Sequence, residues 1–508
     1  MHLLTKEQAQ QLDSLSQEKY GISARELMGN AGQQIAETVI NLLADQHDPL
    51  IGVICGKGNN GGDGFAAAAV LKSKGFRLCL YYLNRESAIT GTPRFYYQQC
   101  TEAGLKVESI VELPIEMPDF DLIIDCILGT GYRLPLRKGM EPWIRWINEH
   151  SAVIVSADVP SGVEANSGAL DPVAVRADNT VTMGYGKLGL FLEPGKSCSG
   201  AVQVADIGFP EITEQLDGRK WNLVTEAFIQ SQIKPLDPGT HKHAQGKVLL
   251  VAGSVGMTGA AYLATMGALR VGAGLTITFA PASLNTIYEI KITEGLTVPC
   301  EDHGQGHLSI ANYPTIAAWF NWCDAVVIGP GLGKGDETIE LVKKLIIKSP
   351  KPLVLDADGL RAVYSEAQII SSTQQPVIIT PHHGELSRLT KKPAAEIRLN
   401  LIETIDEVIH GLNCILVAKN APTCIAWGDS GYVNPTGNPG LASGGTGDVL
   451  SGMIGGLVAQ GYAPEIAALL GVFLHGQTAD RIAGETGMRG IIASDLLTAL
   501  PAALKAYD

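Results

Sequence analysis

The sequence predicts an α/β protein of two domains, and three observations carry this prediction. The chain has 508 residues, of which 45% are hydrophobic and 18% charged, so it exceeds the length that one hydrophobic core usually supports. Short apolar runs alternate with helical stretches in two series, which is typical of parallel β-α-β units. Many of the 58 glycines follow these runs, where α/β folds hold phosphates on backbone amides.

The first series starts with an amphipathic helical stretch from Thr5 to about Leu43. Its expected strands are LIGVICG from 50, LCLYYL from 78, LIIDCIL from 122 and AVIVSADVP from 152. The expected strands of the second series are KVLLVAG from 247, LTITFAP from 275, AVVIGPGLG from 325, PLVLDADGL from 352, PVIITPHHGEL from 376 and CILVAKNAPTCIAW from 414.

A polar, proline-containing segment at 211–245 separates the two series. We therefore place a domain boundary near residue 225, which gives domains of 1–225 and 226–508. The halves show no convincing internal repeat, so we expect two unrelated domains and not a duplication.

The charge of the chain disfavours a nucleic-acid partner. Lys and Arg number 38 against 52 Asp and Glu, a net charge of -14, and no dense basic run could follow a phosphate backbone. The N-terminus lacks the basic start and apolar core of a signal peptide, and the apolar stretches are interrupted by Gly, Pro or charge. We expect a cytoplasmic protein without a membrane partner.

The 9 cysteines form no C-x-x-C pair and no zinc-type spacing with histidines, so we interpret them as reduced core residues. Apolar faces on the expected C-terminal helices permit self-association. We expect a homo-oligomer, for which a tetramer is one arrangement.

The first glycine motif spans 55–64, after an expected strand and before the helical stretch that begins at Phe65. Its glycines match G-x-G-x-x-G, which lets a backbone approach a pyrophosphate. An ordinary dehydrogenase adds an acid about 20 positions later to hold the ribose, but 82–85 reads Tyr-Leu-Asn-Arg, which disfavours that class. The motif also holds two Asn and an Asp, which a phosphate contact would not need; the alternative is that they form turns or cap a helix.

Two further polar segments follow expected strands. Asp125 ends one strand and precedes a glycine loop at 129–135, and Asp158 lies in the segment 156–162 after the next strand. Because the carboxyl ends of parallel strands line the ligand crevice of an open α/β sheet, we expect all three segments at one site.

The motifs N-N-G-G-D-G, L-G-T-G-x-x-x-P and S-A-D-x-P-S-G resemble the YjeF N-terminal domain family, the NAD(P)H-hydrate epimerases, over about residues 4–206. The resemblance implies a Rossmann-like three-layer αβα sandwich that binds the hydrates NADHX and NADPHX. The implied hydrate-binding residues are Asn59, Asn60, Gly61, Gly62, Asp63, Gly129, Thr130, Gly131, Tyr132, Arg133, Leu134, Pro135 and Asp158. It also implies a K⁺ ion held by Asn60, Asp125 and Ser161, whose oxygens suit a hard cation. Gly29 departs from the charged or larger residue expected there.

The implied reaction is plausible chemistry for a carboxylate. In the hydrate a hydroxyl on C6 lies beside the ring nitrogen, whose lone pair can expel it and leave a flat iminium that water attacks on either face. Asp158 would protonate the leaving oxygen and deprotonate the incoming water, work typically worth about 10²- to 10⁴-fold. The alternative is that Asp158 only orients the ribose or the nicotinamide.

The second half contains the glycine-rich run 438–448, which ends in Asp448 and leads into an apolar helical stretch. Closely spaced glycines free backbone N–H groups at a helix start and form an anion hole for a transferring phosphoryl group. Asp448 can accept a proton from an attacking hydroxyl there. The alternative is a helix-capping Asp, but the helix dipole favours that by only about 0.3–1 kcal/mol, and it would not require four preceding glycines.

G-G-T-G-D resembles the anion-hole motif of ribokinase-like small-molecule kinases. Together with G-P-G-L-G, D-A-D-G-L, T-P-H-H-G-E and K-N-A-P-T it resembles the ADP-dependent NAD(P)H-hydrate dehydratases over residues 245–505, which implies a ribokinase-like α/β domain. The implied ADP-binding residues are Lys419, Asn420, Ala421, Pro422, Thr423, Asn438, Pro439, Gly440, Leu441, Ala442, Ser443, Gly444, Gly445, Thr446 and Gly447. The implied hydrate-binding residues are Ala260, Gly331, Pro381, His382, His383, Gly384, Glu385, Leu386, Ser387 and Asp448. His383 and Asn420 depart from the family's Pro and Gly.

In the implied reaction, phosphorylation of the C6 hydroxyl makes a better leaving group, and Mg²⁺ assists the phosphoryl transfer. Since such a dehydratase repairs one epimer, a fused epimerase would supply it from the other. The choice of ADP over ATP rests on the resemblance, because a glycine loop binds phosphate groups without distinguishing a diphosphate from a triphosphate. Two other interpretations stay open: a vitamin-precursor or sugar kinase with an accessory nucleotide-binding domain, and a binding or regulatory protein without turnover.

Overall fold

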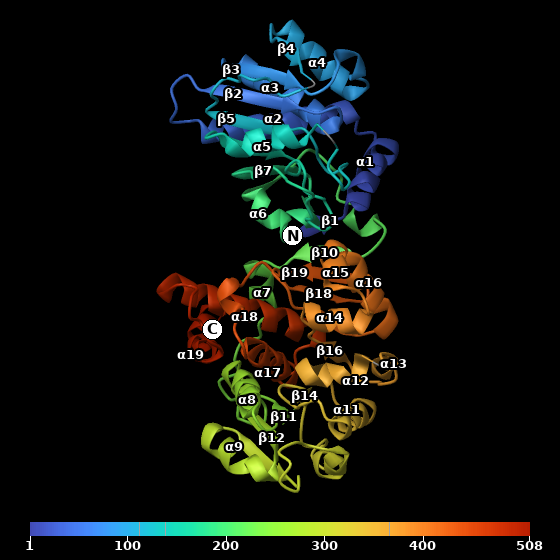
Figure 1. The fold of residues 1–508 in the computed structure, drawn as a ribbon, viewed down its shortest axis with the longest axis vertical. Helices are drawn as coiled ribbons and strands as arrows, with labels where there is room; N and C mark the ends of the chain where they lie inside the picture. The colour runs from blue at the N-terminus through green and yellow to red at the C-terminus, as the bar shows by residue number, and fades with distance from the viewer. Residues whose placement is uncertain (111, 138, 365, 508) are drawn as a thin grey trace. The chain divides into compact units, whose positions relative to one another are not determined.

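The computed structural model describes residues 1–110, 112–137, 139–364 and 366–507. It divides into two compact units, residues 2–221 and residues 222–508 together with residue 1 (Figure 1). None of the described helices is long and apolar enough to span a bilayer.

The N-terminal unit is built on a parallel sheet with the strand order β4-β3-β2-β5-β6-β7-β9. Its strands are β2 (Leu50–Cys55), β3 (Arg77–Tyr82), β4 (Val107–Ser109), β5 (Leu122–Cys126), β6 (Val153–Ala157), β7 (Asn179–Met183) and β9 (Ala201–Ala205). Its helices are α1 (Lys6–Tyr20), α2 (Ala24–Leu42), α3 (Asn59–Ser73), α4 (Thr92–Glu102), α5 (Glu141–Glu149) and α6 (Gly195–Ser199). All four apolar runs expected to be strands are strands of this sheet.

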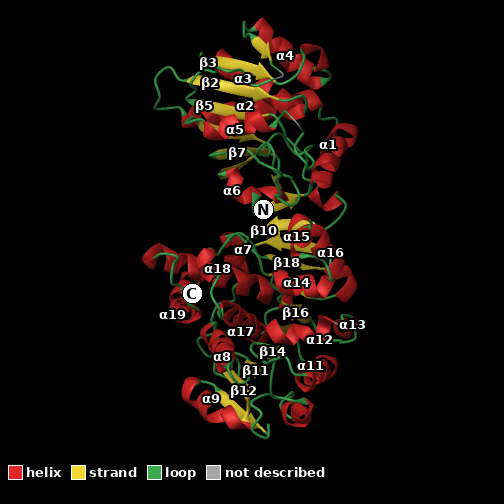
Figure 2. Ribbon diagram, in the orientation of Figure 1, coloured by secondary structure: helices red, strands yellow, loops and turns green. Residues whose placement is uncertain are grey.

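The sheet has helices on both faces because its central strands are apolar on both sides. In β2, Val53 packs in the core formed with α2 and α3, whereas the next residue, Ile54, packs on the other face with Trp143 and Ile147 of α5. The unit is therefore a three-layer αβα sandwich, which confirms the predicted fold class (Figure 2).

The first helical stretch differs from the expectation because it is two helices. Gly21, with φ 70, ends α1 in the left-handed conformation, and Ser23 caps α2 by accepting a hydrogen bond from Glu26 N–H. Glycine adopts this conformation without the steric penalty of a side chain, so the chain stops one helix and starts another there. Before α1, strand β1 (His2–Leu4) pairs in parallel with β8 (Gly186–Lys187).

The C-terminal unit contains the strand order β13-β12-β11-β14-β15-β16-β17-β18-β19, parallel as far as β17 and antiparallel beyond it. The strands are β11 (Lys247–Val251), β12 (Leu275–Pro281), β13 (Leu296–Cys300), β14 (Ala325–Ile328), β15 (Leu353–Leu355), β16 (Val377–Ile379), β17 (Ile415–Ala418), β18 (Cys424–Trp427) and β19 (Ser430–Val433), and β10 (Lys220–Leu223) spans the boundary between the units. The helices are α7 (Glu226–Gln232), α8 (Thr258–Arg270), α9 (Asn285–Lys291), α10 (Tyr313–Ala317), α11 (Asp336–Lys348), α12 (Arg361–Tyr364), α13 (Gln368–Ser371), α14 (His383–Thr390), α15 (Ala394–Leu399), α16 (Leu401–Leu412), α17 (Thr446–Ala459), α18 (Pro464–Thr486) and α19 (Ala493–Leu504).

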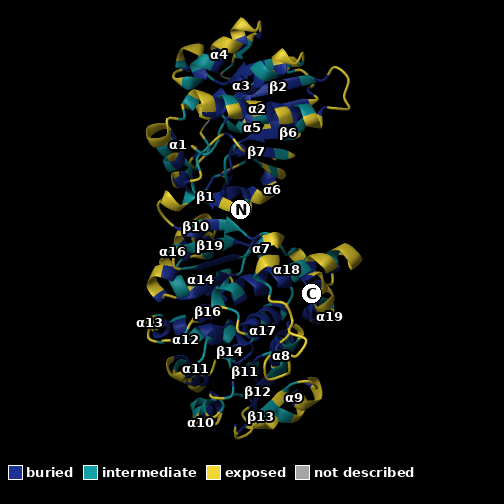
Figure 3. Cartoon of the chain, turned by 180° about the vertical axis from the view of Figure 1, so that it is seen from behind, coloured by how far each residue is buried: buried dark blue, intermediate teal, exposed yellow. Residues whose placement is uncertain are grey.

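Helix α17 lies in the middle of the C-terminal core and is buried almost all round, as its apolar sequence requires (Figure 3). Two glycines allow α8 and α17 to approach closely. A Cβ at Gly452 would lie 1.9 Å from Ala264 O, and one at Gly267 would lie 2.5 Å from Val449 O. This packing fixes the start of α17, which carries the glycine-rich motif.

Candidate active sites

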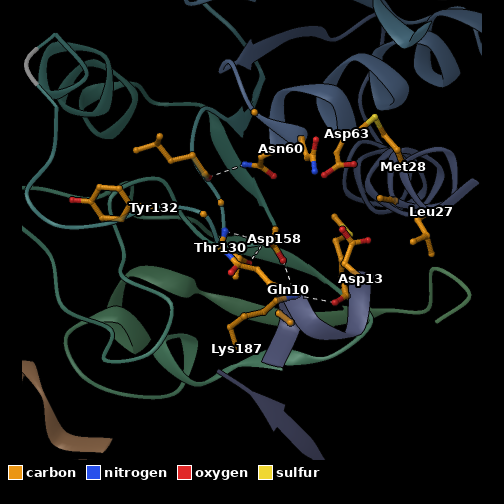
Figure 4. Close-up of a pocket in the computed structure, with 18 of the residues that line it drawn as sticks. Gln10, Asp13, Leu27, Met28, Asn60, Asp63, Thr130, Tyr132, Asp158 and Lys187 are labelled. Atoms are coloured by element: carbon orange, nitrogen blue, oxygen red, sulfur yellow. Dashed lines mark hydrogen bonds and ion pairs between the residues drawn. The ribbon is translucent and has the colours of Figure 1, made fainter. Parts of the chain in front are cut away.

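A pocket of about 870 Å³ lies in the N-terminal unit, at the carboxyl ends of the parallel strands (Figure 4). The first turns of α3, the loop after β5 and the segment after β6 line it, together with residues of α1 and α2. This volume lies within the range of about 300–1,000 Å³ that is usual for small-molecule sites.

The segment N-N-G-G-D is helical, which corrects the expectation that a loop leads into a helix at Phe65. Helix α3 begins at Asn59, and its glycines allow it to pack tightly: a Cβ at Gly61 would lie 1.9 Å from Gly56 O, and one at Gly64 would lie 2.7 Å from Cys55 Sγ. The glycines therefore have a packing role in addition to any ligand contact. No side chain caps α3, whose N-cap is Gly58, so its Asn and Asp residues are not caps.

Asp158 stands at the centre of this pocket in a fixed geometry. Its φ of 64 is left-handed, a conformation that Asp adopts more readily than most residues. Its Oδ1 lies 2.7 Å from the ammonium of Lys187, and its Oδ2 accepts hydrogen bonds from the N–H of Thr130, at 3.1 Å, and from the Thr130 hydroxyl. Burial alone would raise the pKa of Asp158, but Lys187 and these hydrogen bonds lower it below its usual value.

The three residues implied as K⁺ ligands form one polar cluster beside the pocket. Ser161 Oγ donates a hydrogen bond to Asp125 Oδ1 at 2.5 Å and accepts one from Leu128 N–H. The carbonyl oxygen of Leu128 accepts a hydrogen bond from Asn60 Nδ2 at 2.7 Å. Asn60 Oδ1 is buried and finds no hydrogen-bond partner within the described part of the chain. Burial raises the pKa of Asp125, while hydrogen bonds from Ser161, Ile127 and Ser156 oppose that shift.

The structure brings most of the expected N-terminal residues together. Those that line the pocket are Asn59, Asn60, Asp63, Gly129, Thr130, Gly131, Tyr132, Arg133 and Asp158. Those that do not line it are Gly61, Gly62, Leu134 and Pro135. Lys187 was missed by the sequence analysis, although a lysine within the otherwise uncharged stretch 179–192 is a signal for a paired, buried charge.

A second pocket, of about 490 Å³, lies in the C-terminal unit at the start of α17. Asp448, in the first turn of α17, lines it. The N-cap of α17 is Gly445 and no side chain caps the helix, so the capping interpretation of Asp448 is wrong. Burial, and next the negative charge of Asp356, raise the pKa of Asp448 to about 7, despite the opposing charge of Lys419.

An ion pair between a partly buried lysine and a buried aspartate lies beside the glycine-rich start of α17. Lys419 Nζ lies 2.6 Å from Asp356 Oδ1, which also accepts a hydrogen bond from the Thr380 hydroxyl at 2.7 Å. A Cβ at Gly447 would lie 3.4 Å from Lys419 Nζ. The lysine is thus next to backbone N–H groups that a helix leaves free at its first turn, an arrangement that binds anions.

Helix α18 holds the glycine-rich loop in place. His475 Nε2 donates to the carbonyl of Thr446 at 3.0 Å, and burial lowers the pKa of His475 to about 4, so the ring is neutral at physiological pH. One turn further on, Asp480 accepts hydrogen bonds from Gly437 N–H at 2.8 Å and Asn438 Nδ2 at 2.9 Å. Sequence analysis missed both, because they lie 29 and 42 residues from their partners.

The C-terminal pocket gathers fewer of the expected residues. Those that line it are Ala260, Gly331, Glu385, Gly444, Gly445 and Asp448. Outside its lining are Pro381, His382, His383, Gly384, Leu386, Ser387, Lys419, Asn420, Ala421, Pro422, Thr423, Asn438, Pro439, Gly440, Leu441, Ala442, Ser443, Thr446 and Gly447. The pocket also has basic residues that were not expected: Lys334, Arg361 and Arg388.

Comparison with known proteins covers both units. The family described as YjeF-related protein N-terminus matches residues 24–189, and the family described as NAD(P)H-hydrate dehydratase matches residues 248–502. The bifunctional NAD(P)H-hydrate repair enzyme Nnr of Moorella thermoacetica is 36% identical over 513 residues, 99% of this chain and 97% of its own. The enzyme of the same name from Thermofilum pendens is 36% identical over 501 residues, 97% of this chain and 94% of its own.

The chain belongs to the bifunctional NAD(P)H-hydrate repair enzymes. Among solved structures, a ribokinase-like superfamily protein from Enterococcus faecalis matches with a TM-score of 0.50 and 24% identity, covering 56% of this chain and 96% of its own. The predicted ribokinase-like fold of the second domain and the predicted repair function are both confirmed, and they are supported over the alternative of a vitamin-precursor or sugar kinase.

The structure explains one departure from the repair-enzyme pattern. A Cβ at Gly29 would lie 2.5 Å from the hydroxyl oxygen of Tyr96, which donates a hydrogen bond to Arg25 O at 2.7 Å. The tyrosine hydroxyl occupies the space that a side chain at position 29 would need, so a larger residue there would require Tyr96 to move.

The other two departures, His383 and Asn420, lie together. The backbone of His382 runs beside that of Lys419 as a parallel bridge, in which Lys419 N–H donates to Pro381 O at 2.9 Å. One residue further along each segment, the side chain of Asn420 is near enough to His383 to influence its pKa, which burial lowers. Two changes that looked independent in the sequence therefore form one contact.

Proposed function

We propose that the N-terminal unit epimerises the R and S forms of NADHX and NADPHX, and that the C-terminal unit dehydrates the S form while ADP becomes AMP and phosphate. The proposal assigns 1–225 to the epimerase and 226–508 to the dehydratase. The observation that carries it is that each unit has a pocket lined by the aspartate that its sequence motif predicts: Asp158, whose pKa is lowered, and Asp448, whose pKa is raised to about 7.

In the epimerase, Asp158 is the base at the reacting carbon. The Lys187 ammonium and the Thr130 hydroxyl keep it ionised, so it can take a proton from a water that attacks C6 of the iminium. The pocket residues of α3 and of the loop after β5 hold the dinucleotide, with the free N–H groups of α3 facing its pyrophosphate.

Asn60, Asp125 and Ser161 fit a potassium ion, because Asn60 Oδ1 is buried without a hydrogen-bond partner among the described residues and Asp125 is a buried carboxylate. When bound, the ion would supply positive charge beside the negatively charged dinucleotide.

In the dehydratase, Asp448 removes the proton from the C6 hydroxyl, whose oxygen attacks the terminal phosphorus of ADP and releases AMP. The ring nitrogen then expels phosphate from C6, and loss of a proton from C5 restores the dihydronicotinamide. The glycine amides before Asp448 and the Lys419 ammonium stabilise the charge that develops on the phosphoryl group.

A magnesium ion fits this site, because Asp356, Asp358 and Glu385 all add negative charge around Asp448. When bound, it would neutralise phosphate charge, held mainly by the phosphates and by one or two of these carboxylates.

We further propose that the repair enzyme works in the cytoplasm as a homo-oligomer, with a tetramer as one arrangement. Exposed apolar residues at α9 and the edge strand β13, namely Ile287, Ile290 and Leu296, support self-association. Light scattering in solution would give the mass, and a monomer at micromolar concentration would contradict this proposal.

The products distinguish a dehydratase from a kinase. Wild-type enzyme is given the S epimer of NADHX with ADP and Mg²⁺, and AMP, phosphate and NADH are quantified together. The proposal predicts equal amounts of the three. A stable phosphorylated nicotinamide compound, or NADH formed without nucleotide consumption, would contradict it.

A further inference from the structure

Asp63 is the second carboxylic acid of the N-terminal pocket, and it lacks the partners that Asp158 has. It lies in the first turns of α3 and lines the pocket, but no donor among the described residues hydrogen-bonds or ion-pairs with its carboxyl group. Asp158, by contrast, is held by Lys187 and Thr130. Figure 4 shows the two aspartates reaching the same space from different elements.

The surroundings shift the pKa values of the two acids in opposite directions. Burial, and next the negative charge of Asp158, raise the pKa of Asp63 well above its usual value, with Asp13 adding to this and Lys187 opposing it. The charge of Asp63 also acts on the thiols of Cys55 and Cys126 and on the hydroxyl of Tyr96. The pKa values of these three groups are raised, so they are neutral and add no charge to the pocket. When the environments of two titratable groups in one site push their pKa values apart, one group usually acts as the acid and the other as the base.

Epimerisation at C6 needs proton transfer on both faces of the ring. The hydroxyl leaves one face of a planar iminium and water adds to the other. A single carboxylate could serve both faces only if the ring turned over between the two steps. Two acids that reach the pocket from different elements, α3 and the segment after β6, can each serve one face and remove that requirement.

We propose that Asp63 is a second acid–base residue of the epimerase, acting on the nicotinamide face opposite to the one that Asp158 serves. The inference rests on the proposed epimerase function of this unit. Its geometric basis is the shared pocket, the two separate elements and the free carboxyl group of Asp63.

The proton balance is simple. Asp63 donates its proton to the C6 oxygen as the C6–O bond breaks, and the lone pair of the ring nitrogen forms the C=N bond, so water leaves. A second water then adds to C6 from the other face and gives its proton to Asp158, while the C=N electrons return to nitrogen. Asp63 ends ionised and Asp158 protonated, and exchange with solvent restores both; the reverse reaction starts with Asp158 as the acid.

The test compares Asp63→Asn and Asp158→Asn with the exposed control Asp45→Asn, which makes the same charge change outside the pocket. Full-length enzymes are assayed with K⁺, from pure R and from pure S epimer of NADHX, and the epimers are separated over time across pH. Thermal unfolding and the KM for the hydrate report folding and binding.

We expect both pocket variants to lose about 10²- to 10⁴-fold in kcat in each direction, as for loss of a general acid or base, with KM changed only a few-fold. Asp63→Asn should also lose the alkaline limb of the pH profile, which a purely structural role would leave in place. An Asp63→Asn enzyme that keeps wild-type kcat or the wild-type alkaline limb overturns the proposal for Asp63 alone. A wild-type enzyme no faster than spontaneous epimerisation overturns the epimerase function, and Asp63 with it.

Discussion

The ammonium of Lys187 lies 2.7 Å from Oδ1 of Asp158, with 4% of the lysine side chain and 14% of the aspartate side chain exposed. The same ammonium donates hydrogen bonds to Met183 O at 2.8 Å and to the Thr182 hydroxyl at 3.1 Å. A buried lysine with all three protons used is fixed in position. It therefore holds the Asp158 carboxylate both in place and in its ionised form.

Replacing Lys187 with Met should move the acid limb of the epimerase. Without the ammonium, burial dominates and the pKa of Asp158 rises, so kcat/KM should begin to fall at a higher pH than in the wild type. Breaking a buried ion pair also typically destabilises a protein by about 3–5 kcal/mol. Lys72→Met, on the exposed side of α3, is the control, and an acid limb at the wild-type pH in Lys187→Met would show that the pair does not set the protonation of Asp158.

Asp63→Asn should stabilise the fold at alkaline pH. Because the folded pKa of Asp63 is raised, the folded state binds a proton that the unfolded chain releases above its own pKa, so this residue reduces stability as the pH rises from about 4. The variant should therefore melt above the wild type at pH 8 and level with it near pH 4. A variant that melts lower at pH 8 would mean that the carboxyl makes stabilising contacts in its ionised form.

The dehydratase should have an ionisation near neutrality that belongs to Asp448. Since only the ionised form accepts a proton, kcat/KM for the S epimer should rise with pH through about 7 and level off above it. Asp448→Asn should lower the rate about 10²- to 10⁴-fold and leave no ionisation near 7. If Asp448→Asn keeps the wild-type pH profile at any measurable rate, another group is the base.

His383 and Asn420 should behave as one unit. Proline is tolerated at position 383, which is the first residue of α14, and Asn420 is not among the residues with positive φ, so His383→Pro and Asn420→Gly should both fold. Each should alter the KM for ADP or the hydrate, and the double variant should match either single one, with a coupling of about 0.5–3 kcal/mol. Additive effects would show that the contact does not join the two segments.

Potassium should stabilise the N-terminal unit through Asn60. Replacing K⁺ by an equal concentration of tetramethylammonium should lower both the melting temperature and the epimerase rate, since binding to the folded state stabilises it. In Asn60→Ala the two salts should give the same melting temperature. A K⁺ effect of wild-type size in that variant would place the ion elsewhere.

The fold could be predicted from the sequence because the buried strands of a parallel α/β sheet are short apolar runs that can be recognised in it. Strand β2, for example, lies between β3 and β5 and is buried along most of its length, so it had to be apolar. The start of α3 was misplaced because glycines normally end helices. Here Gly61 and Gly64 are helical and allow contact with Gly56 and Cys55, which no local pattern shows.

The sites could be predicted only in part, because some of their residues are distant from the motifs in the sequence. Asp158 and Asp448 stand next to glycine motifs and could be found, whereas Lys187, His475 and Asp480 act on those motifs from distant points of the chain. Their roles depend on tertiary contacts, as does the meeting of His383 with Asn420. Local sequence can show which chemistry a motif offers, but not which residues tune it.

Recovery of NADH from the pure R epimer requires both active sites to work in sequence. Full-length enzyme is given R-NADHX, ADP, Mg²⁺ and K⁺, and the appearance of dihydronicotinamide absorbance is compared among wild type, Asp158→Asn and Asp448→Asn. We expect full recovery by the wild type, recovery limited to the spontaneous epimerisation rate by Asp158→Asn, and restoration of the wild-type rate when the two variants are mixed. Wild-type recovery no faster than spontaneous epimerisation, or equal recovery by Asp158→Asn, would contradict an enzyme with two sites acting in sequence.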